Sequence, residues 1–159
     1  MDKVILILFC VALSGSACSN NQTETFEYSS DKTEADWISY FSEIGHNVTD
    51  LSNHTILVMY PSNCASCINE LEWWNNKYQE GFKSKISIVL IERHPATQNN
   101  FVDVHKLQLP IFNDREGVVL KRELVPATPV KIYFNSKSEL VTMMPMNSRN
   151  LSQFLKKVE

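Results

Sequence analysis

Two cysteines separated by two residues, Cys64 and Cys67, constrain this chain more than any other feature. They follow an apolar run over residues 55–60, which is typical of a buried strand, and they open an amphipathic segment over residues 68–78. A strand that leads into such a pair at the start of a helix places the first thiol among unpaired backbone N–H groups. The positive end of the helix lowers the pKa of a cysteine there and favours the reactive thiolate. The second thiol, one helical turn away, is close enough to close a disulfide.

The start of the chain has the pattern of an export signal. Lys3 gives a short basic start, residues 4–13 are apolar, and small residues 14–17 precede Cys18. The apolar run is about half the length of a membrane span, which favours a secretory signal. Small residues before a cysteine resemble a bacterial lipobox, so we expect a signal peptide over residues 1–17 and a lipid on Cys18. Cleavage near Ala17 without a lipid, or a retained anchor, are the alternatives.

The number of cysteines narrows the chemistry further. The chain has four, of which Cys10 and Cys18 belong to the leader, so the mature domain retains Cys64 and Cys67 as its thiols. A structural disulfide framework and a four-cysteine zinc site are therefore excluded. An exported pair at this spacing would oxidise, so we expect redox exchange in preference to inert thiols.

Composition predicts one domain after a tether. Residues 18–32 are polar and without an apolar period, which indicates a lipidated flexible tether, and residues 33–159 are the length of a single domain. The net charge is −3, and no cluster of lysines and arginines occurs, so nucleic-acid binding has no electrostatic support. We expect a monomer that faces the periplasm from the bacterial cell envelope.

Hydrophobic periodicity predicts an α/β domain. A helix with the apolar stripe Ile68, Leu71, Trp74 and Tyr78 lies between two apolar strands, which implies a parallel pair with a right-handed crossover. Helices on both faces of a mixed central sheet give a three-layer α/β/α architecture. The expected helices cover residues 33–44, 68–78, 97–107 and 147–158, with a turn or short helix in 115–124. The expected strands cover 55–60, 86–91, 110–113, 129–134 and 140–143.

This order of elements resembles the thioredoxin fold, and within it the TlpA/ResA-like periplasmic thiol-disulfide oxidoreductases. The resemblance covers most of residues 50–159. It is carried by Cys64-x-x-Cys67 after a strand, by Glu70 three residues later, and by Thr128-Pro129 at the start of a strand. Three positions depart from the family pattern: Asn63 replaces a tryptophan, Ser66 replaces a proline, and Val58 replaces the buried acid of thioredoxin.

The resemblance implies a role for each matched residue. Cys64 would attack a protein disulfide, and Cys67 would resolve the mixed disulfide. Glu70 would move a proton to or from Cys67, with a solvated helix carboxylate as the alternative. The Thr128-Pro129 bond would be cis and face the dithiol, and the backbone at Thr128 would pair with a bound substrate strand.

The resemblance also implies the partners. No cofactor is needed, since the Cys64–Cys67 disulfide carries the electrons. The partners are protein thiols and disulfides, a membrane-embedded electron carrier, and the membrane through the N-terminal lipid. The family favours reduction, although oxidants share this architecture. One alternative is a Cu(I) chaperone that uses Cys64, Cys67 and a methionine from Met143, Met144 and Met146. Another is a substrate-binding domain without turnover.

Overall fold

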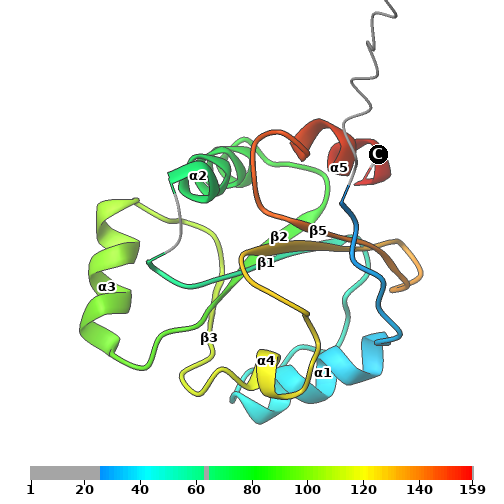
Figure 1. Cartoon of the computed structure of the whole chain (residues 1–159), viewed down its shortest axis with the longest axis horizontal. Coiled ribbons are helices and arrows are strands. Elements are labelled where there is room, and N and C mark those ends of the chain that lie inside the picture. The colour runs from blue at the N-terminus through cyan, green and yellow to red at the C-terminus, as the bar shows by residue number, and fades with distance from the viewer. Residues whose placement is uncertain (1–25, 63–64, 159) are drawn as a thin grey trace, which may run out of the picture.

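A mixed sheet lies at the centre of the molecule, in a computed structural model that describes residues 26–62 and 65–158 (Figure 1). Within these residues the sheet has five strands in the order β3-β2-β1-β4-β5. The strands are β1 His54–Met59, β2 Lys85–Leu90, β3 Ile111–Asn113, β4 Val130–Phe134 and β5 Leu140–Pro145. The helices are α1 Glu34–Glu43, α2 Ala65–Gln79, α3 Pro95–Val104, α4 Val118–Lys121 and α5 Leu151–Val158.

The strand directions agree with the sequence pattern. β1 and β2 are parallel, with Thr55 opposite Ile86, and α2 forms the crossover between them. β4 runs antiparallel to β1, with Val58 opposite Val130, and β5 returns beside β4 as the second strand of a hairpin. The predicted mixed sheet of an α/β domain is therefore confirmed.

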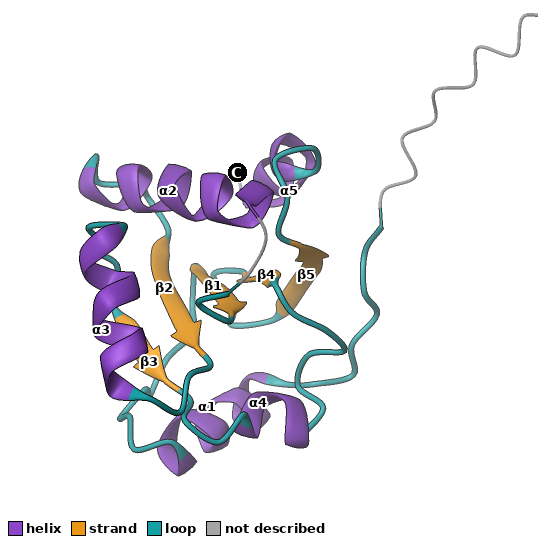
Figure 2. Ribbon diagram, turned by 60° about the vertical axis from the view of Figure 1, so that its left-hand side comes forward, coloured by secondary structure: helices purple, strands orange, loops and turns teal. Residues whose placement is uncertain are grey.

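Helices cover both faces of the sheet (Figure 2). α2 and α5 lie over one face, α1 and α4 lie over the other, and α3 lies beside the β3 edge. β1 is buried along its whole length because its side chains alternate between these two layers. Leu57 packs in the core beneath α2 and α5, whereas Val58 packs in the core beside α1. This explains why the strand is a continuous apolar run.

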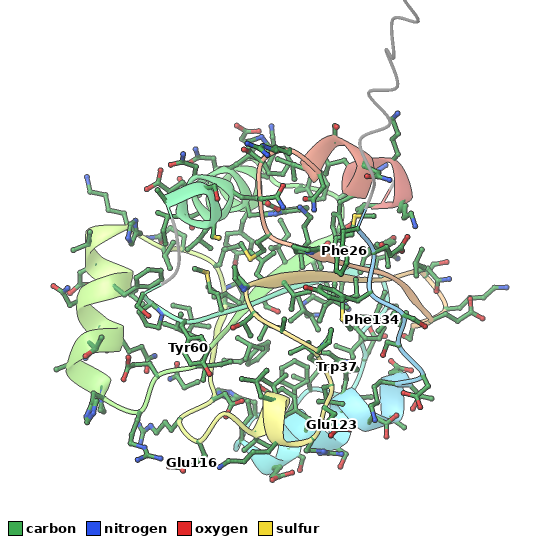
Figure 3. All side chains as sticks on the ribbon, in the orientation of Figure 1. Phe26, Trp37, Tyr60, Glu116, Glu123 and Phe134 are labelled. Atoms are coloured by element: carbon green, nitrogen blue, oxygen red, sulfur yellow. The ribbon has the colours of Figure 1, made fainter. Side chains whose placement is uncertain are left out.

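The core beside α1 is rich in aromatic side chains. Trp37 of α1 and Phe134 of β4 point toward one another in Figure 3, with ring centroids 6.1 Å apart and nearly perpendicular planes.

α1 begins with a capping box in which the Thr33 side chain accepts a hydrogen bond from the backbone N–H of Asp36, and the Asp36 carboxylate accepts one from the backbone N–H of Thr33. Such a reciprocal cap satisfies two N–H groups that a helix start otherwise leaves unpaired.

The buried face of α2 differs from the predicted stripe. Ile68, Leu71 and Trp74 face the core, but Tyr78 is 39% exposed. Asn75 is buried instead, because it accepts a hydrogen bond from the backbone N–H of Gln108 at 2.7 Å and donates one to a backbone carbonyl of the same loop. The buried face of α2 therefore includes a polar residue, whereas the aromatic residue that periodicity assigned to this face is partly exposed.

The described part of the expected tether contacts the domain. The backbone N–H of Tyr28 donates to the carbonyl of Met143 in β5 at 2.8 Å, and Glu27 forms an ion pair with Lys157 of α5 at 2.6 Å. Figure 3 places Phe26 beside the same part of the domain. The predicted signal peptide and Cys18 lie outside the described residues. Within the described part of the chain, none of the helices has the length and apolar character needed to cross a bilayer.

Candidate active site

The dithiol segment lies where β1 ends and α2 begins. β1 ends at Met59, residues 60–62 lead away from the sheet, and α2 starts at Ala65. Cys67 lies in the first turn of α2, is 2% exposed, and is disulfide-bonded. Cys64, its partner by sequence, lies outside the described residues, as do Cys10 and Cys18. The described part therefore holds an oxidised cysteine at the start of the helix after a parallel strand.

Thr128 and Pro129 lie at the same edge of the sheet. The peptide bond between them is cis, both residues are half-buried, and β4 begins at the next residue. Because Val130 stands opposite Val58, Pro129 is brought beside the end of β1 from which the chain continues to Cys67. Two segments about sixty residues apart in the sequence thus meet at one edge.

Glu70 is buried beneath α2. It is 1% exposed and lies three residues after Cys67, so the two side chains are neighbours on one helical face. Its Oε1 atom accepts hydrogen bonds from Trp74 Nε1 at 3.1 Å and from Lys131 Nζ at 2.8 Å. Oε2 is buried without a hydrogen-bond partner of normal geometry among the described residues.

Lys131 comes from β4, two residues after Pro129. Its side chain is fully buried and points into the layer beneath α2 and α5, like its strand neighbours Leu57 and Met144. Besides Glu70, its ammonium group donates to Asn150 Oδ1 at 2.6 Å and lies 5.4 Å from the ring centroid of Phe154. Asn150 immediately precedes α5, so the cation joins three elements of the fold.

Burial and the ion pair have opposite effects on the pKa values of Glu70 and Lys131. Burial raises the pKa of Glu70, while Lys131, Trp74 and the backbone of Asn147 each lower it, and the net direction is upward. Burial lowers the pKa of Lys131, and Glu70 opposes that shift. The carboxylate would bind a proton far more readily if the cation were absent.

Lys131 is the site residue that the sequence interpretation missed. The residues 129–134 were predicted to form a strand, and β4 is indeed buried at every position. A strand flanked by helices on both faces has no solvent face, so a lysine within it must find an acidic or polar partner. That signal was present in Val130-Lys131-Ile132, although nothing in the sequence identified Glu70 as the partner.

The methionines near β5 divide between the two cores. Met144 and Met146 pack in the same core as Cys67, whereas Met143 packs in the core beside α1. Residues 26–62 and 65–158 contain no group of three or more His, Cys, Asp or Glu side chains arranged to hold a metal ion. Met143, Met144 and Met146 are all buried as members of these two apolar cores.

A hollow of about 310 Å³ borders the dithiol segment. Pro61 and Ser62 line one side of it, and Asn100, Phe101 and Val104 of α3 line the other. Another hollow, of about 1100 Å³, lies around the end of α2 and the start of β2, and so is a helix length away from Cys67.

Comparisons with known proteins agree with this arrangement. No family model matches the chain. The chain is 24% identical over 115 residues to the sporulation thiol-disulfide oxidoreductase A of Bacillus subtilis, covering 68% of this chain and 70% of that protein. The crystal structure of that protein, StoA, superposes with a TM-score of 0.52 at 19% identity, covering 67% and 84% of the two chains.

A second solved structure is that of a secreted disulfide oxidoreductase of Mycobacterium tuberculosis, homologous to DsbE of Escherichia coli. It superposes with a TM-score of 0.56 at 16% identity, covering 68% of this chain and 82% of the other. The chain has a thioredoxin-like fold. The predicted fold class is confirmed, and the relatives support a thiol-disulfide oxidoreductase and do not favour the copper chaperone.

Proposed function

We propose that the protein is an extracytoplasmic thiol-disulfide oxidoreductase that acts on protein disulfides through Cys64 and Cys67. The observation that carries this function is the oxidised Cys67 in the first turn of α2, the helix that follows the end of β1 which Pro129 also borders. The similarity to StoA supports the same activity. No cofactor is required, because the two sulfurs exchange the electrons themselves.

In the reductive direction, the Cys64 thiolate attacks one sulfur of a substrate disulfide. The substrate S–S bond breaks, a mixed disulfide forms, and the departing substrate thiolate takes a proton. Cys67 then loses its proton and attacks Sγ of Cys64. The intramolecular disulfide forms, and the second substrate sulfur leaves as a thiolate and is protonated. The substrate gains two electrons and two protons, and a membrane-embedded electron carrier returns both to the dithiol.

Glu70 is the proposed group for the proton of Cys67. It is buried on the same face of α2, which supports a proton-transfer role over a solvated helix carboxylate. Thr128 and Pro129 are the proposed substrate contacts. Proline has no N–H group to present toward the sulfurs, and both residues are half-buried at the edge of the sheet where β1 ends.

The proposed location is the bacterial cell envelope, facing the periplasm, with a signal peptide over residues 1–17 and a lipid on Cys18. The polar residues 18–32 then connect the lipid to a monomeric domain. Extraction into detergent together with metabolic labelling by a fatty acid would test the anchor, and Cys18→Ala is the matched control. A chain that stays soluble and unlabelled contradicts this part of the proposal.

The decisive experiment traps substrates with Cys67→Ser, because Cys64 would then form mixed disulfides that cannot resolve. We expect mixed disulfides with exported proteins, and none with Cys64→Ser. The reduction potential of the wild-type protein separates the two directions. A reduction potential of about −270 mV indicates a reductase, and one of about −120 mV indicates an oxidase. The absence of a reversible couple would exclude disulfide exchange in either direction and would leave only a binding role.

A further inference from the structure

Lys131 is a buried charge whose place in the fold needs an explanation. Its ammonium group lies 2.8 Å from Glu70 Oε1, and the side chains of both residues have no solvent exposure. Ion pairs of this kind often contribute no more stability than apolar side chains of the same size, because both charges lose their hydration. Stability of the core alone is therefore a weak reason for a lysine at this position of β4.

The two oxygen atoms of Glu70 have different surroundings. Oε1 accepts from both Lys131 and Trp74, and these two bonds fix the orientation of the carboxyl group. Oε2 has no hydrogen-bond partner of normal geometry among residues 26–62 and 65–158, although it is fully buried. The backbone N–H of Asn147 also approaches this carboxylate and lowers its pKa. Because each carboxylate oxygen has two acceptor sites, Oε2 retains the capacity to accept from a further proton donor.

Cys67 is the thiol on the same helical face. It lies three residues before Glu70, and both side chains are buried in the layer between α2 and the sheet. Of the charged groups that act on Glu70 in the described part of the chain, Lys131 is the one that lowers its pKa by its charge. The lysines of α5, Lys156 and Lys157, lie in its last turn, and Lys157 is paired with Glu27.

We propose that Lys131 is a positioning residue that keeps Glu70 ionised beside Cys67, so that Glu70 Oε2 accepts the proton of the Cys67 thiol. In this step the S–H bond of Cys67 breaks, an O–H bond forms on Glu70, and Lys131 retains its three protons. Asn150 holds the ammonium group in place from the start of α5. The inference rests on the proposed function, because it assigns a residue to the resolving step of the disulfide exchange.

The test follows the resolving step directly. A mixed disulfide of the full-length protein with glutathione is prepared, and the release of glutathione is measured by stopped flow between pH 4.5 and 9. For the wild-type protein we expect the rate to fall at low pH as Glu70 becomes protonated. Lys131→Met should move the midpoint of this fall upward by about one pH unit or more, as expected when a carboxylate loses an adjacent cation.

Glu70→Gln and the double variant provide the matched controls. Glu70→Gln should abolish this midpoint, so that the rate follows thiolate formation alone. If Lys131 acts through Glu70, Glu70→Gln/Lys131→Met should have the same pH profile as Glu70→Gln. A Lys131→Met rate that is lower at every pH, with an unmoved midpoint, would overturn the inference. The inference would also be overturned if Lys131→Met shifted the pH profile in the Glu70→Gln background as much as it does in the wild type.

Two further measurements keep the result interpretable. Lys131→Gln removes the charge while retaining a polar group toward Glu70 and Asn150, and it replaces Lys131→Met if that variant does not fold. Failure of the proposed function has a different signature, in which no glutathione is released from the wild-type protein at any pH, or release continues in Cys67→Ser.

Discussion

The ammonium group of Lys131 lies 2.8 Å from Glu70 Oε1, although the two residues are sixty-one positions apart and both side chains are fully buried. This contact joins α2, which carries Cys67, to β4, which begins after Pro129. The helix that carries Cys67 and the strand that follows Pro129 are thus connected by an ion pair beneath the helix.

Removing one partner of this ion pair should destabilise the domain strongly. We expect Lys131→Met to lower the free energy of unfolding at pH 8 by about 3–5 kcal/mol, because Glu70 is left as an unpaired buried charge. Protonation of Glu70 relieves this cost. Burial already raises the pKa of Glu70 above 4.5 in the wild type, and loss of the cation should raise it further. The folded variant should therefore bind more protons than the unfolded chain, so the loss of stability grows as pH rises.

Urea unfolding at pH 5 and pH 8 measures this effect. Lys137→Met is the matched control, since Lys137 is exposed in the turn before β5, and it should change stability by less than about 0.5 kcal/mol. Glu70→Gln/Lys131→Met should be more stable at pH 8 than Lys131→Met. Equal losses for Lys131→Met at both pH values would mean that Glu70 is already neutral beside the lysine.

His54 predicts a separate dependence of stability on pH. It is buried at the start of β1, where Nε2 contacts Ser87 Oγ at 2.8 Å and Nδ1 has no partner in the described part of the chain. Burial, with a smaller effect from Lys85 and an opposing effect from Asp50, lowers its pKa from 6.5 to about 4. The unfolded chain therefore binds the proton more readily than the folded one.

Stability contributed by neutral His54 is complete above pH 6.5 and is lost as pH falls toward 4. The full difference corresponds to about 3 kcal/mol. We expect His54→Gln to have a shallower loss of unfolding free energy between pH 7 and pH 4 than the wild type, measured by chemical denaturation at each pH. His94→Gln is the control, because His94 is exposed at the start of α3. Parallel curves for wild type and His54→Gln would contradict the prediction.

The methionines should be replaceable by other apolar side chains. Met144→Leu and Met146→Leu keep the volume of the core around Cys67, so each should cost less than about 1.5 kcal/mol of stability. Since the thioethers serve as packing, disulfide exchange with a protein substrate should stay within about twofold of wild type. Met144→Ala provides the contrast, with an expected loss of about 2–5 kcal/mol. A Leu variant that folds but does not exchange disulfides would assign a chemical role to the thioether.

Much of the fold follows from local patterns, and the part that does not follow depends on tertiary contacts. The capping residues Thr33 and Asp36 predict the start of α1, and the apolar runs predict β1 and β2, because these signals act within a few residues. Tyr78 was assigned to the core because helical spacing does not report which neighbours are available. In the structure Tyr78 is partly exposed, whereas Asn75 is buried through hydrogen bonds with the loop after α3.

The candidate site also has one part that the sequence predicts and another part that depends on tertiary contacts. The spacing of Cys64, Cys67 and Glu70 and the later Thr128-Pro129 are visible in the sequence, and the relatives agree with the fold they imply. Glu70 is buried in an ion pair with Lys131, which approaches from another element. A single sequence records both residues but not that they meet.

The hollow beside the dithiol segment predicts how substrates are distinguished. Val104 is 63% exposed and lines this hollow together with Pro61 and Ser62, so it is available to an apolar side chain of a protein substrate. Val104→Asp should slow exchange with a protein disulfide several-fold through a higher KM, because the carboxylate must be desolvated on binding. Reduction of the same variant by dithiothreitol should be unchanged, since a small reagent does not use the hollow. Val141→Asp, at an exposed position of β5, introduces the same charge elsewhere and should leave both rates unchanged. Equal effects of the two substitutions would exclude the hollow as a substrate contact.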